Sequence, residues 1–461
     1  MDIIIGLEIH VGLKTKTKLF CSCPQPKEGD EPNTKVCEVC VGFPGSKPVV
    51  NKQALEHALK LCLALNCKIA PTLIFSRKTY YYPDMGKNYQ ITQYEEPLGS
   101  NGKLSIGDKT ITIDRIQLEE DPGALTHQGT TTLVDYNRSG KPLCEIVTAP
   151  DFTSPDEARE FLKRLLTLLH YLGIFDEKEG VIKADANISI KGYERVEIKN
   201  ITGFKEIERA LNYEIERQRL LVRENQGLKH RETRGWDADK GITLFQRKKE
   251  QEEDYGYILD PDLVPIELTT EKIEQTKREL PELPQQKAWR YQQEYSLKLQ
   301  DAEALANDYK LAALFETALK TIEPLAAAEW IRREVVRVLN YNKKELEETF
   351  IETHLLEVLE LLKQKTITRQ TGQRLMELLV DKDVLIKTYV QENNLETVQD
   401  TEFLEDICKK VALENKKAVE EYLNGEEKSF NFLVGNVMRL TKGKADPAAV
   451  HEALKKTIKA T

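Results

Sequence analysis

The chain has 461 residues and a formal net charge of −9, and 40% of its residues are hydrophobic while 31% are charged. This length exceeds what a single hydrophobic core usually serves, so we expect two or three domains. No apolar run is long enough to span a bilayer, and the N-terminus lacks the basic and apolar regions of a secretory signal. These features predict a cytoplasmic protein without a membrane partner. The acidic balance disfavours a general coat for nucleic acid but allows a local basic surface.

The sequence IIIGLEIHVGL at residues 3–13 predicts a β-strand, because apolar side chains fall on alternate positions. The opposite face carries Glu8 and His10, with Gly6 and Gly12 on either side. A surface face would ordinarily carry Lys, Thr or Ser instead. The two glycines predict that the face is open beside the carboxylate and the imidazole, which favours a ligand site.

Short alternating runs predict further strands in the first ~280 residues. These runs are residues 80–82, 105–113, 143–148, 181–190 and 194–201. One clear helix interrupts them, with Ser154 as N-cap, Pro155 in the first turn and Glu157 completing a capping box.

Long helical patterns dominate after residues 281–284, and a compact set of helices follows residues 393–394. The predicted fold class is therefore α+β. We expect an antiparallel-sheet cradle domain over residues 1–284, a helical domain over 285–395 and a small helical tail domain over 396–461.

Cysteine spacing gives the most specific local signal. Cys21 and Cys23 are separated by thirteen residues from Cys37 and Cys40. Two close pairs of thiolates across a loop suit a tetrahedral zinc ion, and an intracellular chain disfavours disulfides. Four protein ligands leave no open position, so a zinc knuckle at residues 21–40 would be structural. The alternative is four small buried thiols.

A second signal is polar side chains within β-rich segments. A turn at residues 191–193 would join two strands and place Asp185, Asn187, Glu197 and Lys199 on one face. A solvated hairpin face is the alternative interpretation.

Glu145 lies in an apolar stripe between Leu143 and Val147, where a lone carboxylate is costly unless a cation or hydrogen-bond donors meet it. Further acids, Glu119 and Glu120, end another predicted strand, and alternation does not decide which of the two points inward.

These acids, together with Glu8 and His10, form a set of oxygen ligands with one imidazole. Such a set suits Mg²⁺ or Mn²⁺ better than zinc, and Mg²⁺ held by a few carboxylates commonly serves phosphate substrates. The alternative for each acid alone is a solvated or locally paired carboxylate.

Arg77 and Lys78 lie beside the tyrosines of residues 80–82, where cations could meet phosphates and a ring could stack on a base. A Tyr-rich strand with exposed basic ends is an equally good interpretation. The chain has no GxxxxGK[ST], GxGxxG or GxSxG motif. Residues 437–461 contain six Lys or Arg against two acids, which indicates either a cationic binding surface or a solvated helix face.

Several motifs resemble one family in sequence order between residues 5 and 456. They are IGLEIHVGLKTKTKLFCSCP, EPNTKVCEVCVGFPGSKPVVN, RKTYYYPDMGKNYQITQYEEP, LEEDPGALTH, DYNRSGKPLCEIVTAPD, KADANISI and EIKNITGF. In these motifs the chain resembles the GatB family, the B subunits of aspartyl/glutamyl-tRNA amidotransferases. The tail sequence FNFLVGNVMRLTKGKADPAAVHEALKK resembles the YqeY-like domain of that family.

The resemblance implies a carbon–nitrogen ligase that uses ATP and Mg²⁺ to phosphorylate the side-chain carboxylate of misacylated Glu-tRNA(Gln) or Asp-tRNA(Asn). Ammonia released from glutamine by the amidase (A) subunit then displaces phosphate, and the small (C) subunit makes the assembly a heterotrimer. Misacylated tRNA is the expected nucleic-acid partner, with no DNA partner. The absence of an amidase nucleophile motif agrees with this division of work.

The resemblance also implies roles for individual residues. The expected Mg²⁺ ligands are His10, Glu120 and Glu145, and the other expected catalytic residues are Glu8, Asp185 and Asn187. The residues expected near the nucleotide are Arg77, Lys78, Tyr82, Gln90 and Lys199. The four cysteines match a Zn²⁺ knuckle found in some members of the family.

Two alternatives remain open at this point. A non-catalytic, zinc-containing tRNA-binding scaffold would make the carboxylates incidental. The paralogous GatE family shares the cradle but carries a large inserted domain, and no segment here is long enough to be that insertion. The sequence does not distinguish between the two tRNA substrates.

Overall fold

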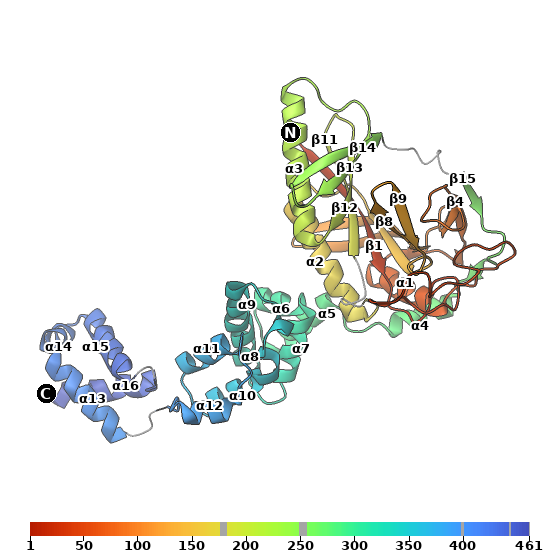
Figure 1. Ribbon diagram of the computed structural model, residues 1–461. Helices are drawn as coiled ribbons and strands as arrows, with labels where there is room; N and C mark the ends of the chain where they lie inside the picture. Colours follow the sequence, from red (N-terminus) through yellow and green to blue (C-terminus); the bar gives the residue numbers. More distant parts are fainter. Residues whose placement is uncertain (176–181, 249–255, 398–400, 442–443, 461) are drawn as a thin grey trace. The chain divides into compact units, whose positions relative to one another are not determined.

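The computed structural model describes residues 1–175, 182–248, 256–397, 401–441 and 444–460 (Figure 1). The chain divides into two compact units, residues 1–284 and 285–461. Across the described ranges, no helix combines the length and the apolar character needed to cross a membrane.

A nine-stranded sheet forms the centre of the first unit. Its strands, in spatial order, are β14 (Ile242–Lys248), β13 (Glu232–Asp237), β12 (Val196–Thr202), β11 (Ile182–Ile190), β1 (Ile3–Gly12), β10 (Pro142–Thr148), β7 (Lys109–Glu120), β6 (Gly99–Ile106) and β2 (Lys68–Ile69). Neighbouring strands are antiparallel except for β12 and β13, which are parallel. The N-terminal strand therefore lies in the middle of the sheet.

Smaller sheets lie beside the large one. Three strands form one of them: β15 (Gly256–Leu259), β4 (Ser76–Thr79) and β5 (Tyr89–Thr92). Strands β8 (Ala124–Gln128) and β9 (Thr131–Asp135) form a hairpin, and β3 (Thr72–Leu73) pairs with β16 (Ile266–Glu267).

Helices cover one face of the large sheet and bury its apolar side chains. They are α1 (Lys52–Ala64), α2 (Pro155–Leu172) and α3 (Phe204–Arg223), and α4 (Thr270–Arg278) packs on α1. Ile5, Leu7 and Ile9 of β1 are fully or almost fully buried in this core. Because side chains alternate along a strand, the intervening side chains of β1 project from the opposite face.

The predicted α+β class is confirmed, as is the helix that begins at Pro155 after the N-cap Ser154. The prediction of a single helix in this half is wrong, because α1, α3 and α4 are also present. Residues 80–82 are not a strand, since β4 ends at Thr79 and the chain turns at Pro83. The run 105–113 spans the turn between β6 and β7. Residue 181 of the predicted run 181–190 lies outside the described residues.

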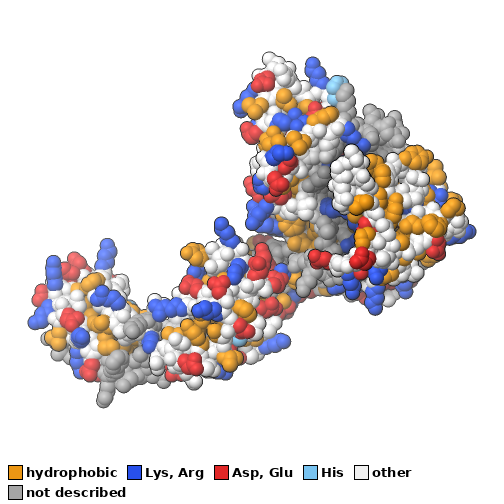
Figure 2. Space-filling model, viewed as in Figure 1, with side chains coloured by type: hydrophobic (Ala, Val, Ile, Leu, Met, Phe, Trp, Pro, Cys, Tyr) orange, Lys and Arg blue, Asp and Glu red, His pale blue; other side chains and the backbone are white. Residues whose placement is uncertain are grey.

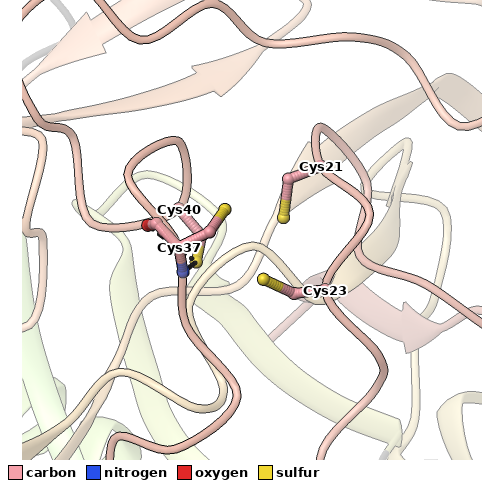
Figure 3. A group of neighbouring side chains, drawn as sticks. All are labelled: Cys21, Cys23, Cys37 and Cys40. Atoms are coloured by element: carbon pink, nitrogen blue, oxygen red, sulfur yellow. Dashed lines mark hydrogen bonds between the residues drawn. The ribbon is translucent and has the colours of Figure 1, made fainter.

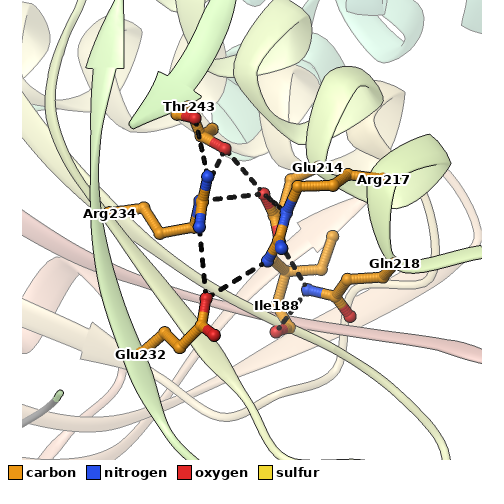
Figure 4. Close-up of polar contacts among 7 residues, drawn as sticks. All are labelled: Ile188, Glu214, Arg217, Gln218, Glu232, Arg234 and Thr243. Carbon is orange, nitrogen blue, oxygen red and sulfur yellow. Dashed lines mark hydrogen bonds and ion pairs between the residues drawn. The ribbon is translucent and has the colours of Figure 1, made fainter. Parts of the chain in front are cut away.

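A buried ionic cluster fixes α3 against the end of the sheet (Figure 4). The fully buried carboxylate of Glu214 accepts hydrogen bonds from Arg217 (2.7 Å), Gln218 (3.0 Å) and Thr243 (2.9 Å). Arg234 of β13 lies 3.8 Å from Glu214 and 3.2 Å from Glu232. We call these residues the Glu214 cluster. Its two acids and two arginines balance in charge.

The second unit is helical. Its helices up to residue 392 are α5 (Pro284–Tyr295), α6 (Leu299–Ala306), α7 (Tyr309–Ala318), α8 (Pro324–Glu329), a π-helix (Trp330–Val335), α9 (Val336–Asn342), a 3₁₀ turn (Leu346–Glu348), α10 (Ile351–Lys363), α11 (Arg369–Leu378) and α12 (Ile386–Glu392). They share one apolar core, which includes Tyr291 and Phe315.

The last helices have an apolar core of their own, around Leu433 and Leu454. They are α13 (Thr401–Glu414), α14 (Lys416–Leu423), α15 (Glu427–Leu440) and α16 (Pro447–Ala460). Lys and Arg side chains are spread over the visible surface of these helices, with acidic side chains among them (Figure 2).

Candidate active site

Ionisable side chains form a row across five adjacent strands, on the face of the large sheet that the helices leave uncovered. The row runs along β12, β11, β1, β10 and β7. Strand pairing sets Glu8 opposite Asp185 of β11, and His10 opposite Glu145 of β10. Residues far apart in sequence therefore meet because β1 is the central strand.

Glu8, His10 and Glu145 form the centre of this row. One carboxylate oxygen of each acid and one ring nitrogen of His10 lie within 4.8 Å of one another. The predicted common face of Glu8 and His10 is confirmed. The expected open space at Gly6 is not found, because a Cβ there would lie 3.6 Å from Pro150 Cα and 3.7 Å from the Thr148 carbonyl oxygen.

The structure resolves the question left open at residues 119 and 120. The carboxylate of Glu119 lies 3.2 Å from His10 Nε2, on the same side as Gln117, which donates a 2.7 Å hydrogen bond to Glu145. Glu120 projects to the other side of β7. It pairs with the Lys87 ammonium and accepts a 2.9 Å bond from the Ile91 amide. The structure thus groups Glu119, rather than Glu120, with His10.

Negative charge in this row is only partly compensated. Burial and the neighbouring Glu145 raise the pKa of Glu8, and burial and Glu119 raise the pKa of Glu145. Burial alone would lower the pKa of His10, but the hydrogen bond and charge of Glu119 raise it to about 10. The carboxylates therefore draw a proton onto the imidazole.

This arrangement fits a divalent cation. Carboxylate oxygens with one imidazole are a donor set that Mg²⁺ or Mn²⁺ accepts, and a cation would take over the role of the His10 proton. A further observation supports a ligand on this face. Asn187 lies opposite Gly6 in the same row, and its Oδ1 atom is buried and has no hydrogen-bond partner.

The predicted hairpin of residues 181–190 and 194–201 is confirmed in its described part, as the antiparallel pair β11 and β12. Lys199 donates a 2.7 Å hydrogen bond to Asp185 and lies 3.4 Å from Glu197. Burial would lower the pKa of Lys199, but Asp185 and Glu197 raise it. Thr233 of β13 donates to Glu197 over 3.1 Å. Both acids at this end of the row therefore have partners within the protein, with one ammonium shared between them.

The remaining predicted nucleotide residues lie on β4, on β5 and in the turn between them. Arg77 donates to Asp260 (2.8 Å) and Asp262 (2.9 Å), and its guanidinium lies 4.3 Å from the centroid of the Tyr89 ring. Gln90 is buried and donates to the carbonyl oxygen of Glu120 over 2.8 Å.

Two others differ in their surroundings. The positive charge of Lys78 helps to stabilise the Glu119 and Glu145 carboxylates, so Lys78 lies near the row. Tyr82 is 54% exposed on the surface of the turn. Lys78 thus lies near the row, whereas Arg77 is paired with Asp260 and Asp262.

The four cysteines converge from two loops (Figure 3). The Sγ atoms of Cys21, Cys23, Cys37 and Cys40 lie within 4.8 Å of one another. Four thiolates around a tetrahedral zinc ion, with Zn–S near 2.3 Å, are about 3.8 Å apart. The cluster could therefore hold a metal ion with little rearrangement.

Sequence reasoning missed Gln117 and Thr233 as members of the row, and it did not find Lys87. The register between β7 and β10 places Gln117 opposite Glu145, and that register is not visible in either segment alone. An alternation of Gln117 and Glu119 around the apolar Leu118 was the available signal.

Comparison with known proteins gives a consistent result. Residues 3–274 match the family model "GatB/GatE catalytic domain", and residues 313–458 match "GatB domain". The chain is 43% identical to the aspartyl/glutamyl-tRNA(Asn/Gln) amidotransferase B subunit of Carboxydothermus hydrogenoformans, with 98% of each chain covered.

Proteins of the same name from two further organisms are similar. The protein from Thermotoga maritima is 41% identical over 99% of this chain and 98% of its own length. The one from Sulfolobus acidocaldarius is 44% identical over 98% of this chain and 99% of its own. The fold, the row of acids on the central strands and these similarities over almost the whole length agree: the chain belongs to the family of aspartyl/glutamyl-tRNA(Asn/Gln) amidotransferase B subunits.

Proposed function

We propose that this protein is the ATP-dependent subunit of a tRNA amidotransferase. It would phosphorylate the side-chain carboxylate of misacylated Glu-tRNA(Gln) and/or Asp-tRNA(Asn), and ammonia would then displace phosphate to give Gln-tRNA(Gln) and/or Asn-tRNA(Asn). A carboxylate oxygen is a poor leaving group toward ammonia, whereas phosphate leaves readily. The observation that supports the proposal most directly is the group of buried Glu145 with half-buried Glu8 and His10, whose negative charge the protein leaves partly uncompensated.

Glu8, His10 and Glu145 would hold Mg²⁺, which supplies charge neutralisation for the triphosphate and the developing phosphoryl group. Glu119 orients the His10 ring through its 3.2 Å contact. The resemblance also assigns Glu120 to this ion. Glu120 would reach it only after leaving Lys87 and the Ile91 amide.

The nucleotide and the aminoacyl end would lie along the same face. Lys78 is the cation best placed to meet phosphate oxygens, because its charge already acts on Glu119 and Glu145. Asp185 and Lys199 border the face on β11 and β12, and the free Asn187 Oδ1 offers an acceptor for a donor of the substrate. For Arg77, Tyr82 and Gln90 we propose contacts near the nucleotide or the ammonia entry.

Ammonia would come from the glutamine-hydrolysing amidase (A) subunit, and the small (C) subunit would complete the assembly in the cytoplasm. Large apolar side chains left in water support a protein partner on the first unit. They include Tyr81, Ile258, Leu259 and Val264, each more than half exposed. Co-purification with the amidase and the small third protein tests this part, and a chain that is isolated alone contradicts it.

We propose that Cys21, Cys23, Cys37 and Cys40 hold a structural Zn²⁺, supported by their convergence and by the soft donor set. Metal analysis of the purified protein tests the proposal. A folded sample without zinc contradicts it.

Residues 396–461 would form a tRNA-binding tail domain, supported by their separate core and by the cations of residues 437–461. Deleting this segment should weaken tRNA binding while the first unit remains folded, because the two do not share a core. Unchanged tRNA affinity of the shortened protein would remove this assignment.

The central test follows phosphate release from ATP in the presence of misacylated tRNA and the amidase. The variants His10→Ala and Glu145→Ala should lose turnover while tRNA binding persists. Asp114→Asn, an exposed acid on β7, is the matched control and should behave as the wild type. Full turnover in the first two variants would favour a non-catalytic tRNA-binding scaffold.

A further inference from the structure

A lysine lies in the interior of the first unit, directly beside the cysteine cluster. Lys18 has no exposed surface. Its Nζ lies 3.5 Å from Cys40 Sγ and 3.3 Å from the carbonyl oxygen of Tyr136. These two atoms accept hydrogen bonds from the ammonium group, which has three donors and no acceptor.

The surroundings of Lys18 provide no carboxylate. Among the described residues, none of the Asp or Glu side chains forms an ion pair with it, whereas the nearby buried Lys87 pairs with Glu120. Burying an ammonium charge without a counter-charge is costly. The group in contact with Lys18 that can carry negative charge is the thiol of Cys40.

The turn that covers Lys18 is built around this contact. Gly140 has φ +83°, a conformation that side chains rarely adopt, and a Cβ there would lie 3.4 Å from Lys18 Cδ and 3.5 Å from Cys40 Cβ. Ser139 in the same turn donates a 2.9 Å hydrogen bond to the carbonyl oxygen of Cys40. The lysine stem and Cys40 are therefore enclosed together and shielded from water.

We infer that Lys18 is a positioning residue of the cysteine cluster, where its ammonium donates to the Cys40 thiolate and offsets part of the charge of the bound metal site. A Zn²⁺ ion with four thiolates carries a net charge of −2, and the burial of Lys18 and Cys40 strengthens the attraction between the ammonium and this centre. The inference rests on the proposal that the cluster holds zinc. It extends that proposal by assigning a charge-compensating residue outside the four ligands.

Lys18 should slow the loss of zinc. Residues that hydrogen-bond to metal ligands commonly change metal affinity by about 10–100-fold. Removing the ammonium leaves the doubly negative centre without a cation at its buried ligand Cys40. We therefore expect zinc to leave about tenfold faster.

The experiment uses the full-length protein with zinc as isolated. Lys18→Met removes the charge and the donors but keeps an unbranched side chain. Lys18→Gln keeps donors but removes the charge. Lys16→Met, an exposed lysine two residues away, is the control. Zinc content is measured first, and the rate of transfer to a chromogenic chelator second. The absorption of the Co²⁺-substituted proteins is recorded as a spectroscopic readout of the thiolate ligands.

The expected result is zinc in all four proteins, faster transfer from both Lys18 variants, and transfer from Lys16→Met at the wild-type rate. The Co²⁺ absorption bands should shift only in the Lys18 variants. If Lys18→Met does not fold, the folded Lys18→Gln decides the question. Equal transfer rates in wild type and Lys18→Gln overturn the role of Lys18 while the zinc proposal stands. Absence of zinc from the wild type overturns the zinc proposal and this inference with it.

Discussion

Two groups of acids, each built around one buried carboxylate, lie on opposite faces of the same sheet, and they differ in how their charge is met. In the Glu214 cluster, two glutamates face Arg217 and Arg234, and amide and hydroxyl donors fill the remaining positions (Figure 4). On the other face, Glu8 and Glu145 lie together with one imidazole within 4.8 Å. Burial alone therefore does not distinguish a structural acid from a functional one. The two groups differ instead in the charge balance of their neighbours.

Strand β13 contributes side chains to both groups of acids. On β13, Glu232 and Arg234 belong to the Glu214 cluster, while Thr233 between them donates to Glu197 on the other face. Alternation along a strand sends neighbouring side chains to opposite faces. The Glu214 cluster on the helix-covered face thus holds β13 in place, and β13 in turn supports Glu197 at one end of the row on the other face.

The largest expected effect concerns the Glu214 cluster, in which the acids are balanced by arginines. Glu214→Ala should lower the free energy of unfolding by about 3–5 kcal/mol, because Arg217 and Arg234 would be left without their buried counter-charge. Urea denaturation followed by circular dichroism measures the change. Glu216→Ala, an exposed glutamate two residues along α3, should leave stability nearly unchanged. A loss below about 1 kcal/mol for Glu214→Ala would show that the cluster does not hold α3 in place.

The next prediction tests the unbalanced side. Glu145→Gln should reduce phosphate release by about 10²–10³-fold, since it removes a group that holds charge near the reacting phosphate. Its stability should not fall, because a carboxylate that neighbours Glu119 and Glu8 is replaced by a neutral amide. The same urea titration measures this. A destabilisation as large as that of Glu214→Ala would mean that the two acid groups do not differ in kind.

Adding Mg²⁺ should stabilise the folded protein. At about 100 times its dissociation constant, a ligand that binds only the folded state contributes about 2.7 kcal/mol. Thermal unfolding with increasing Mg²⁺ measures the shift, with Asp114→Asn as the control that should respond like the wild type. No response in the wild type would contradict a cation site, and an equal response in Glu145→Gln would place the ion elsewhere.

The smallest effect concerns Glu8. Without divalent cations, Glu8→Gln should leave stability unchanged or raise it by up to about 1 kcal/mol, because one of two neighbouring negative charges is removed. The comparison with wild type in chelator-treated buffer measures the difference. A clear loss of stability would show that Glu8 has a sufficient partner within the protein even without a divalent cation.

Much of this site could be predicted from short-range patterns. Alternation in residues 3–13 and in 182–190 places Glu8, His10, Asp185 and Asn187 on one face, and the structure agrees. The reason is local: each strand has one clearly apolar side, which must face the core. The spacing of the four cysteines likewise suffices to bring them together.

Other parts could not be predicted, because they depend on distant pairing. The choice between Glu119 and Glu120 follows from the register of β7 against β10, whose partners lie more than twenty residues away. Helix α3 was not predicted, since two of its six buried positions carry the polar Glu214 and Gln218. These residues are buried only because the arginine and threonine partners of the Glu214 cluster exist, which the segment itself does not reveal.

The central place of β1 has a consequence for biosynthesis. The strand is synthesised well before its partners β10 and β11, which end at Thr148 and Ile190. At about 5–20 residues per second, roughly ten seconds or more pass before both edges of β1 can be paired. Until then an apolar strand with two open edges is available to other chains. Glu8 and His10 are thus synthesised long before their final neighbours on β10 and β11, which makes the nascent β1 segment a natural client for a chaperone.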